Sequence, residues 1–364
     1  MKKLVALLLV AAMCFALAAC GSAASTTAAT EATTAEEPAA AEETAADTTS
    51  TGTETITIIC PYGVGGVADL IGRKFAEVAN GIQTKYNFIV ENMTGGDGFV
   101  ANEYFADEDP MTHDLLVFGY GACYRHDLGK QFGTEEVEWD RHATYPLGTI
   151  DDRIWMVYTT PGTTLADILD KAANGGIKMS GGNPLSDPHL MVGSLLSLLD
   201  NGSSVQVVPY DGGAQQLQGL LNGEVDIFVG ATLAGKDYVE SGDIVPILAF
   251  SENEFTGFVG PDGEVVSVPT VAGDMKAAEL PADIDFTGCI LPGGGSLASH
   301  VGGDEAFQAD MIQLIKDVWN TEEFSGWIAD YGLNRFEVYG DDAVDFYNAA
   351  CEKSVAAYQL LSAG

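Results

Sequence analysis

The chain has 364 residues, 46% of them hydrophobic, and its 53 Asp and Glu against 16 Lys and Arg residues give a formal net charge of −37. This length and apolar content allow two domains or one large one. The acidic balance excludes nucleic acid as a partner, because phosphate binding requires clustered Lys and Arg side chains. We interpret the excess charge as a solvated acidic surface.

The N-terminus has the pattern of a secretory signal. A lysine pair precedes an apolar stretch over residues 4–17, which is too short to span a bilayer. The Leu-Ala-Ala-Cys sequence that ends at Cys20 resembles a bacterial lipobox. We therefore predict a signal peptide over 1–20, with Cys20 lipidated as the first mature residue and anchoring the chain to the bacterial cell membrane. The alternative is a plain secretory signal with an incidental Cys20.

Residues 21–55 consist almost entirely of Ala, Thr, Ser, Glu and Asp. Such a segment cannot bury enough apolar surface to order itself, so we predict a disordered tether. About 35 coil residues reach ~30 Å. The sequence thus predicts a folded extracytoplasmic body that is tied to the membrane only by its lipid.

The body alternates strand-like and helix-like segments, which predicts an α/β fold with mostly parallel sheets. Strands are expected over 56–60, 88–92, 115–118, 154–158, 177–179, 205–210, 225–229 and 245–250. One helix is expected to begin at residue 70 and a second to end at residue 105. Further helices are expected over 165–173, 190–199, 215–221, 308–319 and 341–361.

Four of the expected strands end in exposed loops of small residues, over 63–66, 94–98, 180–183 and 211–214. In open α/β sheets, ligands bind outside the carboxyl ends of the strands. Glycine loops that precede helices offer backbone N–H groups to an anion, and no nucleotide-binding glycine pattern is present in the sequence. No Arg lies in these four loops, so backbone amides are the expected donors. The alternative is a set of ordinary strand-to-helix turns.

Four motifs follow one another along the body. They are a strand ending in Pro-Tyr with a Gly pair and an Asp, a Glu-Asn-x-x-Gly turn, a Val-Pro-Tyr-x-Gly-Gly-Ala loop, and a Val-Pro-Thr segment. In this sequence they lie at 58–69, 91–98, 208–214 and 268–270. Together, and in this order, they resemble the solute receptors of tripartite tricarboxylate transporters, the TctC or Bug family.

The resemblance implies a periplasmic-binding-protein type II fold with two lobes and a ligand cleft between them. It divides the body into a first lobe, 56–156 plus 251–364, and a second lobe, 157–250. The residues expected to bind the ligand are Tyr62, Gly65, Gly66, Asp69, Gly95, Tyr120, Ser180, Gly181, Tyr210, Gly212, Gly213 and Ala214. Asp69 has two interpretations, a contact for a ligand ammonium group or a helix cap.

The implied function is capture of a small carboxylate by hinged lobe closure and its delivery to membrane permease subunits. We expect no cofactor, no metal, no catalysis and a monomeric protein. The sequence departs from the family pattern at Leu185, where glycine is usual, at Asp211, where lysine is common, and at 293–296, where Gly-Gly-Gly-Ser replaces a proline-containing turn.

Two alternatives stay open. The first is a hydrolase-type enzyme using Cys123 with His126, although the sequence contains no G-x-S-x-G motif. The second is a sensor lipoprotein that uses the same fold without transport. The disulfide state of Cys60, Cys123, Cys289 and Cys351 is also open, since four cysteines allow three pairings.

Overall fold

The computed structural model describes residues 53–200 and 204–363, so the predicted signal peptide, Cys20 and nearly all of the predicted tether lie outside the described residues. The first of two five-stranded sheets has the strand order β2-β1-β3-β10-β4. Strand β10 runs antiparallel to its neighbours β3 and β4, whereas β1 is parallel to both β2 and β3. The strands are β1 (Glu54–Cys60), β2 (Tyr86–Asn92), β3 (Leu115–Gly119), β4 (Thr144–Asp151) and β10 (Gly295–His300).

The second sheet repeats this arrangement, with the order β7-β6-β8-β5-β9. Here β5 is the reversed strand, antiparallel to β8 and β9, while β6 is parallel to β7 and β8. The strands are β5 (Trp155–Thr159), β6 (Ile177–Gly181), β7 (Val205–Pro209), β8 (Ile227–Ala231) and β9 (Val245–Phe250). The predicted α/β fold with mostly parallel sheets is therefore confirmed.

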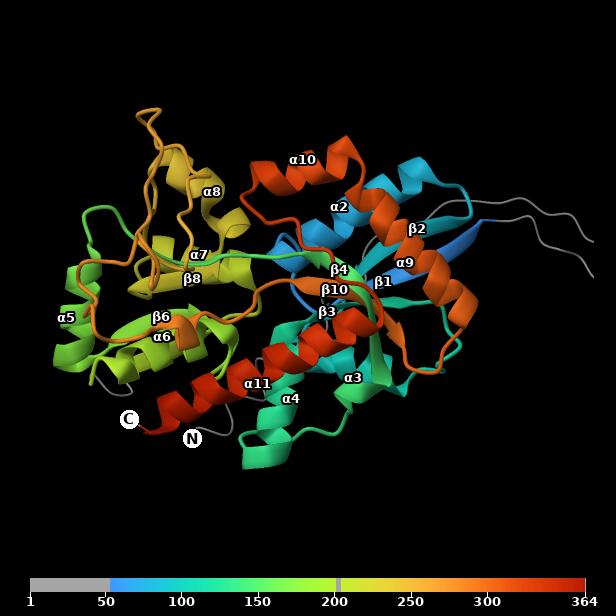
Figure 1. Ribbon diagram of the computed structural model, residues 1–364, viewed down its shortest axis with the longest axis horizontal. Coiled ribbons are helices and arrows are strands. Elements are labelled where there is room, and N and C mark those ends of the chain that lie inside the picture. The colour runs from blue at the N-terminus through green and yellow to red at the C-terminus, as the bar shows by residue number, and fades with distance from the viewer. Residues whose placement is uncertain (1–52, 201–203, 364) are drawn as a thin grey trace, which may run out of the picture. The chain divides into compact units, whose positions relative to one another are not determined.

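Successive side chains of a strand point to opposite faces of the sheet. In the first sheet both faces carry apolar side chains, and helices cover both. Ile56 and Ile58 pack on the face covered by α2 (Val67–Ile82), α9 (Glu305–Trp319) and α10 (Glu322–Asp330). Ile59 points to the other face, which is covered by α3 (Phe99–Asp107), α4 (Tyr120–Phe132) and α11 (Asp341–Ala363) (Figure 1).

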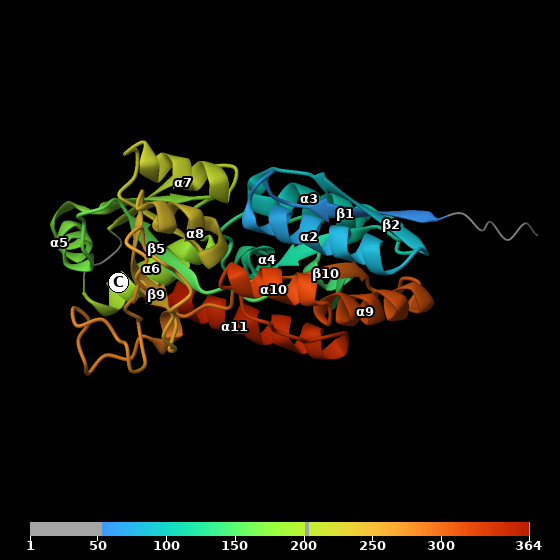
Figure 2. The ribbon, with the colours of Figure 1, turned by 90° about the horizontal axis from the view of Figure 1, so that it is seen from above.

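The second sheet is also covered on both faces. Its β6 residues Ile177 and Met179 pack with α5 (Leu165–Gly175) and α6 (Asp187–Leu198). The opposite face packs with α7 (Gly213–Leu221) and α8 (Thr232–Ser241) (Figure 2).

The segment after β9 corrects one predicted boundary. The sequence analysis groups residues from 251 onward with the first lobe, but Phe255, Phe258 and Val268 pack with Met156 and Phe228 of the second sheet. These apolar side chains form one core with α7 and α8. This stretch therefore belongs to the second lobe by its packing, although the sequence analysis assigned it to the first.

The chain passes between the sheets twice, at 152–154 and at 251–294. Helix α11 packs against α4 beside the first sheet and against α6 beside the second, so one helix supports both (Figure 1). Within the described ranges, no helix has the length and apolar character required to cross a bilayer.

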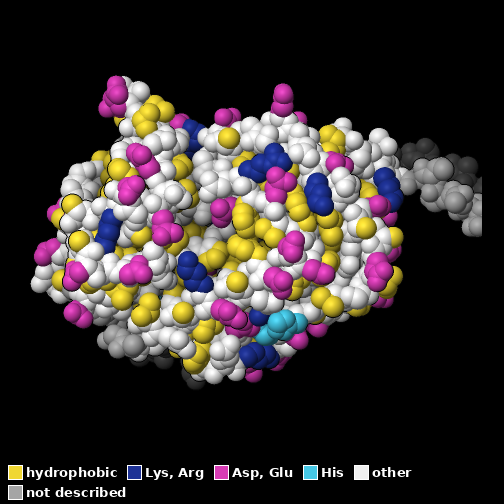
Figure 3. All heavy atoms as spheres, viewed as in Figure 1, with side chains coloured by type: hydrophobic (Ala, Val, Ile, Leu, Met, Phe, Trp, Pro, Cys, Tyr) yellow, Lys and Arg dark blue, Asp and Glu magenta, His cyan; other side chains and the backbone are white. Residues whose placement is uncertain are grey.

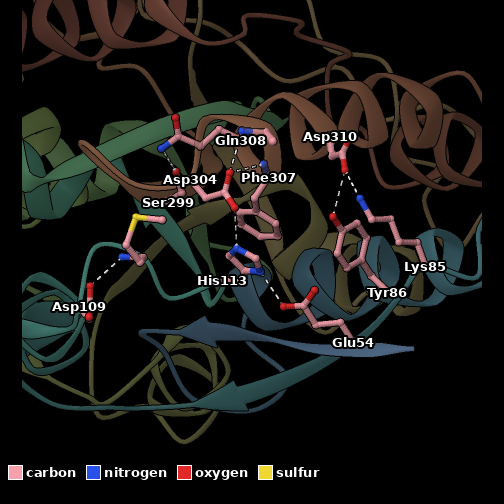
Figure 4. Close-up of polar contacts among 12 residues, drawn as sticks. Glu54, Lys85, Tyr86, Asp109, His113, Ser299, Asp304, Phe307, Gln308 and Asp310 are labelled. Carbon is pink, nitrogen blue, oxygen red and sulfur yellow. Dashed lines mark hydrogen bonds and ion pairs between the residues drawn. The ribbon is translucent and has the colours of Figure 1, made fainter. Parts of the chain in front are cut away.

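Polar contacts hold the end of the first sheet at which β1 and β2 begin, far from the second sheet (Figure 4). His113 Nδ1 lies 2.6 Å from Glu54 Oε1 of β1, and its ring stacks on Phe307 of α9 at 4.1 Å between centroids. Lys85 and Tyr86 both contact Asp310 of α9. This cluster holds α9 against the sheet where β1 and β2 begin, which leaves the opposite end of these strands free for a site.

On the face that Figure 3 displays, acidic side chains are scattered and basic ones are isolated.

Several elements differ from the sequence-based expectation. Residues 120–132, for which the sequence analysis expects no helix, form α4. Strands β4 and β10 and helices α8 and α10 are not among the predicted elements. Pro146 and Gly148 interrupt β4, and β10 consists of Gly, Ser, Leu, Ala and His, so neither strand presents an unbroken run of β-branched or aromatic residues.

Candidate functional site

A cavity of about 130 Å³ lies between the two sheets. The first sheet contributes Tyr62 after β1 and Gly119 at the end of β3, and the second contributes Gly182 after β6 and Ala231 at the end of β8. The reversed strands begin here, with Gly295 in β10 and Trp155 in β5. The carboxyl ends of the parallel strands thus meet at one gap, which is where open α/β sheets bind ligands.

Five helices begin at this cavity, and none has a side-chain cap. Their N-cap residues all line it: Gly66 of α2, Gly119 of α4, Ser186 of α6, Gly212 of α7 and Ala231 of α8. Helices α5, α9 and α10, by contrast, begin away from the cavity and are capped by their own Thr164, Asp304 and Thr321 side chains. The first-turn N–H groups of the five helices are therefore available to an anion, and the helix dipoles favour one.

Four buried polar atoms on the cavity wall have no hydrogen-bond partner. They are Tyr120 Oη, Trp155 Nε1, Ser186 Oγ and Asp187 Oδ1. Leaving a buried polar atom unpaired costs roughly 1–3 kcal/mol, so such atoms usually mark a binding site. Three of these atoms can donate to a ligand, whereas an ionised Asp187 can only accept.

Two arginines line the cavity from outside the four predicted loops. Arg125 in α4 contacts Glu135 at 2.7 Å and Asp97 at 3.4 Å. Arg153, between β4 and β5, contacts Asp151, which is 1% exposed. The expectation that only backbone amides would act as donors therefore does not describe this cavity. Each guanidinium is already neutralised by a carboxylate of the chain.

Five of the predicted site residues line the cavity together: Tyr62, Gly66, Tyr120, Gly212 and Gly213. The other seven do not: Gly65, Asp69, Gly95, Ser180, Gly181, Tyr210 and Ala214. Gly95 and Tyr210 line a neighbouring hollow with Asp97 and Arg125. The hydroxyl of Tyr210 donates to Glu224 at 2.7 Å.

Asp69 supports the first loop from behind. Its buried carboxylate accepts hydrogen bonds from the Gly65 N–H at 2.9 Å, Asn92 Nδ2 at 2.8 Å and the Arg73 guanidinium at 2.9 Å. Burial alone would raise the pKa of Asp69, but these hydrogen bonds from Arg73, Gly65 and Asn92 hold it below its usual value. Both carboxylate oxygens are engaged, so Asp69 holds the loop and is not the N-cap, which is Gly66.

The sequence analysis missed Asp97, Arg125, Arg153 and Asp187. Asp97 lies within the predicted loop 94–98, and Asp187 follows the predicted loop 180–183 along the chain. Their positions in the sequence could therefore have indicated that they belong to the site. The two arginines carry no local signal, because only the folding of α4 and of the crossing at 152–154 brings them to the cavity. No group of three or more metal-ligating side chains occurs within 53–200 and 204–363.

Known proteins share this architecture. No family model matches the sequence. A UPF0065 protein of Bordetella pertussis is 23% identical over 236 residues, which is 64% of this chain and 69% of that protein. Among solved structures, BugD, a periplasmic binding protein, has a TM-score of 0.63 at 16% identity, covering 85% of this chain and 94% of its own.

Two further structures contain bound ligands. Rpa4515 of R. palustris, solved with adipate, has a TM-score of 0.68 at 16% identity, covering 85% of this chain and 98% of its own. MatC (Rpa3494) of Rhodopseudomonas palustris, with bound malate, has a TM-score of 0.67 at 17% identity, covering 85% and 99%. The chain has the fold of the TctC and Bug solute-binding proteins.

One departure from the TctC and Bug sequence pattern, and one further residue with a positive φ, lie beside the cavity. Leu185 stands where that pattern has a glycine, and its φ is +87°, in the left-handed region that favours glycine. Asp97, in the turn after β2, has φ +54°. The Leu185 N–H donates to Nδ1 of His189, so this histidine holds the loop. Unfavourable backbone conformations of this kind concentrate at ligand sites.

Proposed function

We propose that the protein is an extracytoplasmic receptor for a small carboxylate, which it captures between its two sheets. The ligand bridges loops of both sheets and favours the closed arrangement by its higher affinity for that state. The crossings at 152–154 and 251–294 provide the connections about which such closure would occur.

The convergence of five uncapped helix N-termini on one cavity carries this proposal. Backbone N–H groups that lack a cap hydrogen bond and face one cavity are suited to carboxylate oxygens. The unpartnered donors Tyr120 Oη and Trp155 Nε1 add side-chain hydrogen bonds at the same place. Adipate and malate, the ligands of the two structural neighbours, are dicarboxylates, and they support the same ligand class.

The contacts of Cys123 argue against the enzyme alternative. Cys123 lies inside α4, and its thiol contacts the Gly119 carbonyl oxygen at 3.6 Å. Burial raises the pKa of this thiol well above its ordinary value, the opposite of what a nucleophilic cysteine requires. Cys123 also does not line the cavity.

Calorimetric titration of the purified full chain tests the receptor function. We expect micromolar or tighter binding of at least one carboxylate, which corresponds to about −8 kcal/mol or more. The panel contains di- and tricarboxylates and amino acids, with a carboxylate-free diamine as the control. Absence of binding across the panel, together with no retained small molecule in native mass spectrometry, would refute the proposal.

Membrane anchoring and transport form the second part of the proposal. Lipidation of Cys20 would keep the receptor at the membrane, and permease subunits of a tripartite tricarboxylate-type transporter would accept the closed form. Mass spectrometry of the mature N-terminus tests the anchor, with Cys20→Ser as the control that should be released. Co-purification with large and small permease subunits separates the transport role from a sensor role.

A further inference from the structure

Of the four unpartnered polar atoms on the cavity wall, Asp187 Oδ1 is the one that belongs to a carboxylate. Asp187 is the first residue of α6, and its Oδ1 is enclosed and without a hydrogen-bond partner. Its Oδ2 lies against Gly121, where an added methyl group would be 3.3 Å away. The neighbouring Tyr124 hydroxyl donates to the Leu185 carbonyl oxygen at 2.7 Å and also lies against this carboxylate, and no described basic side chain forms an ion pair with Asp187.

The groups that face Asp187 come from several elements. Tyr62 follows β1, Asp97 lies in the turn after β2, Tyr124 and Arg125 belong to α4, and Arg153 lies before β5. Burial raises the pKa of Asp187 to about 7; the Tyr124 hydroxyl beside the carboxylate opposes this increase, and the charge of Asp97 adds to it. Arg125 and Arg153 oppose it from a distance but form no hydrogen bond with Asp187.

The charges at the cavity leave a negative excess. Arg125 is balanced by Glu135 and Asp97, and Arg153 by Asp151. Among the described residues no basic side chain forms an ion pair with Asp187, so a ligand with only carboxylates would place its charge beside this carboxylate when it is ionised. Like charges in a partly buried site repel each other, whereas a cationic group would be attracted to the carboxylate.

We propose that the cavity binds a small zwitterion, in which one or more carboxylates accept from the helix N-termini and an ammonium group donates to Asp187. This inference rests on the proposed receptor function and narrows its ligand to amino-substituted carboxylates. The donors Trp155 and Tyr120 serve the carboxylate end, and Asp187 determines specificity for the ammonium end.

Calorimetry with matched probes tests this assignment. Succinate, malate and aspartate share a four-carbon dicarboxylate skeleton and differ at one position, which carries hydrogen, hydroxyl or ammonium; glutamate and alanine extend the amino series. At pH 8 we expect at least one amino-substituted probe to bind at least about tenfold more tightly than succinate and malate. In Asp187→Asn its affinity should fall about 10- to 100-fold, whereas binding of the ammonium-free probes should be unchanged or tighter.

The pH dependence gives a second readout. An ammonium ligand binds ionised Asp187, so its affinity should rise by up to about tenfold per unit as pH increases toward 7, and level off above it. Glu322→Gln, at the exposed first position of α10, is the matched control and should change neither preference nor pH profile.

The outcomes are distinguishable. Equal binding of succinate and the amino-substituted probes, or equal weakening of both by Asp187→Asn, overturns the zwitterion assignment and leaves the carboxylate receptor intact. Tighter binding of malate alone would assign Asp187 to a hydroxyl donor and also overturn it. Absence of binding by every probe in the full panel removes both proposals.

Discussion

Gly182 and Asp97 meet across the gap between the two sheets. A methyl group on Gly182 would lie 2.4 Å from Oδ1 and 2.6 Å from Oδ2 of Asp97. Gly182 follows β6 of the second sheet, whereas Asp97 lies in the turn after β2 of the first. Arg125 also holds the Asp97 carboxylate, so the turn cannot yield freely. The two loops can approach this closely only because residue 182 has no side chain.

Gly182→Ala should therefore weaken closure. A contact this short forces the loops apart, and we expect ligand affinity to fall by about tenfold, or ~1.4 kcal/mol, with thermal stability nearly unchanged. Calorimetry measures the affinity, and small-angle scattering measures closure on ligand addition. Gly175→Ala, at the exposed end of α5 with no atom near the added methyl, is the control. Unchanged affinity in Gly182→Ala would contradict this role.

Tyr120→Phe should separate binding from stability. Its hydroxyl has no partner in the protein, so its removal should leave the unliganded stability unchanged or higher by up to about 1 kcal/mol. Ligand affinity should fall about tenfold. Tyr347→Phe is the matched control, because the Tyr347 hydroxyl donates to the Phe118 carbonyl oxygen at 2.6 Å. That control should lose about 1 kcal/mol of stability and keep its affinity; the reverse pattern would refute the assignment.

Asp187 should make the unliganded protein less stable as pH rises. Its pKa is about 7 in the folded state against an ordinary value of 3.8, so the folded state holds the extra proton between these values. Unfolding free energy should therefore fall from about pH 4 to pH 7 and level off above, by up to roughly 4 kcal/mol. Asp187→Asn should flatten this part of the curve in denaturant titrations. An equal slope in both proteins would show that Asp187 is not the group responsible.

Asp69 should affect stability rather than ligand choice. Asp69→Asn removes the charge that pairs with Arg73 and accepts from Asn92, and we expect a loss of about 2 kcal/mol. Because the pKa of Asp69 is lowered in the folded state, its contribution is present above about pH 4 and lost as pH falls below it. Urea titrations at pH 3 and 7 measure this. A change in preference between aspartate and succinate would instead indicate a ligand contact.

The four thiols at 60, 123, 289 and 351 should resist alkylation in the native protein. All four are free and buried, and burial raises the pKa of Cys60 and of Cys289 to about 11. Peptide mapping after iodoacetamide at pH 8 should show them unmodified without denaturant and fully modified in guanidinium. Rapid native labelling of any of them would contradict this packing.

The sequence located the loops better than the side chains of the candidate site. Glycine turns after alternating apolar runs correctly indicated the carboxyl ends of β1 and β7, because both signals are local. Gly66, Gly212 and Gly213 consequently reach the cavity. Gly65 does not, because it lies on the exposed side of its turn, and Ser180 does not, because it is a buried residue of β6 rather than of the loop that follows.

By itself, the sequence determined the alternation of strands and helices, the acidic character of the chain and the placement of glycines at strand ends. These properties depend on residues near one another in the chain. Only the tertiary structure decided that Arg125, Arg153, Trp155 and Asp187 share one cavity, since they come from α4, the crossing at 152–154, β5 and α6. Charge balance at a site depends on distances between such groups, and those distances exist only after the sheets have packed.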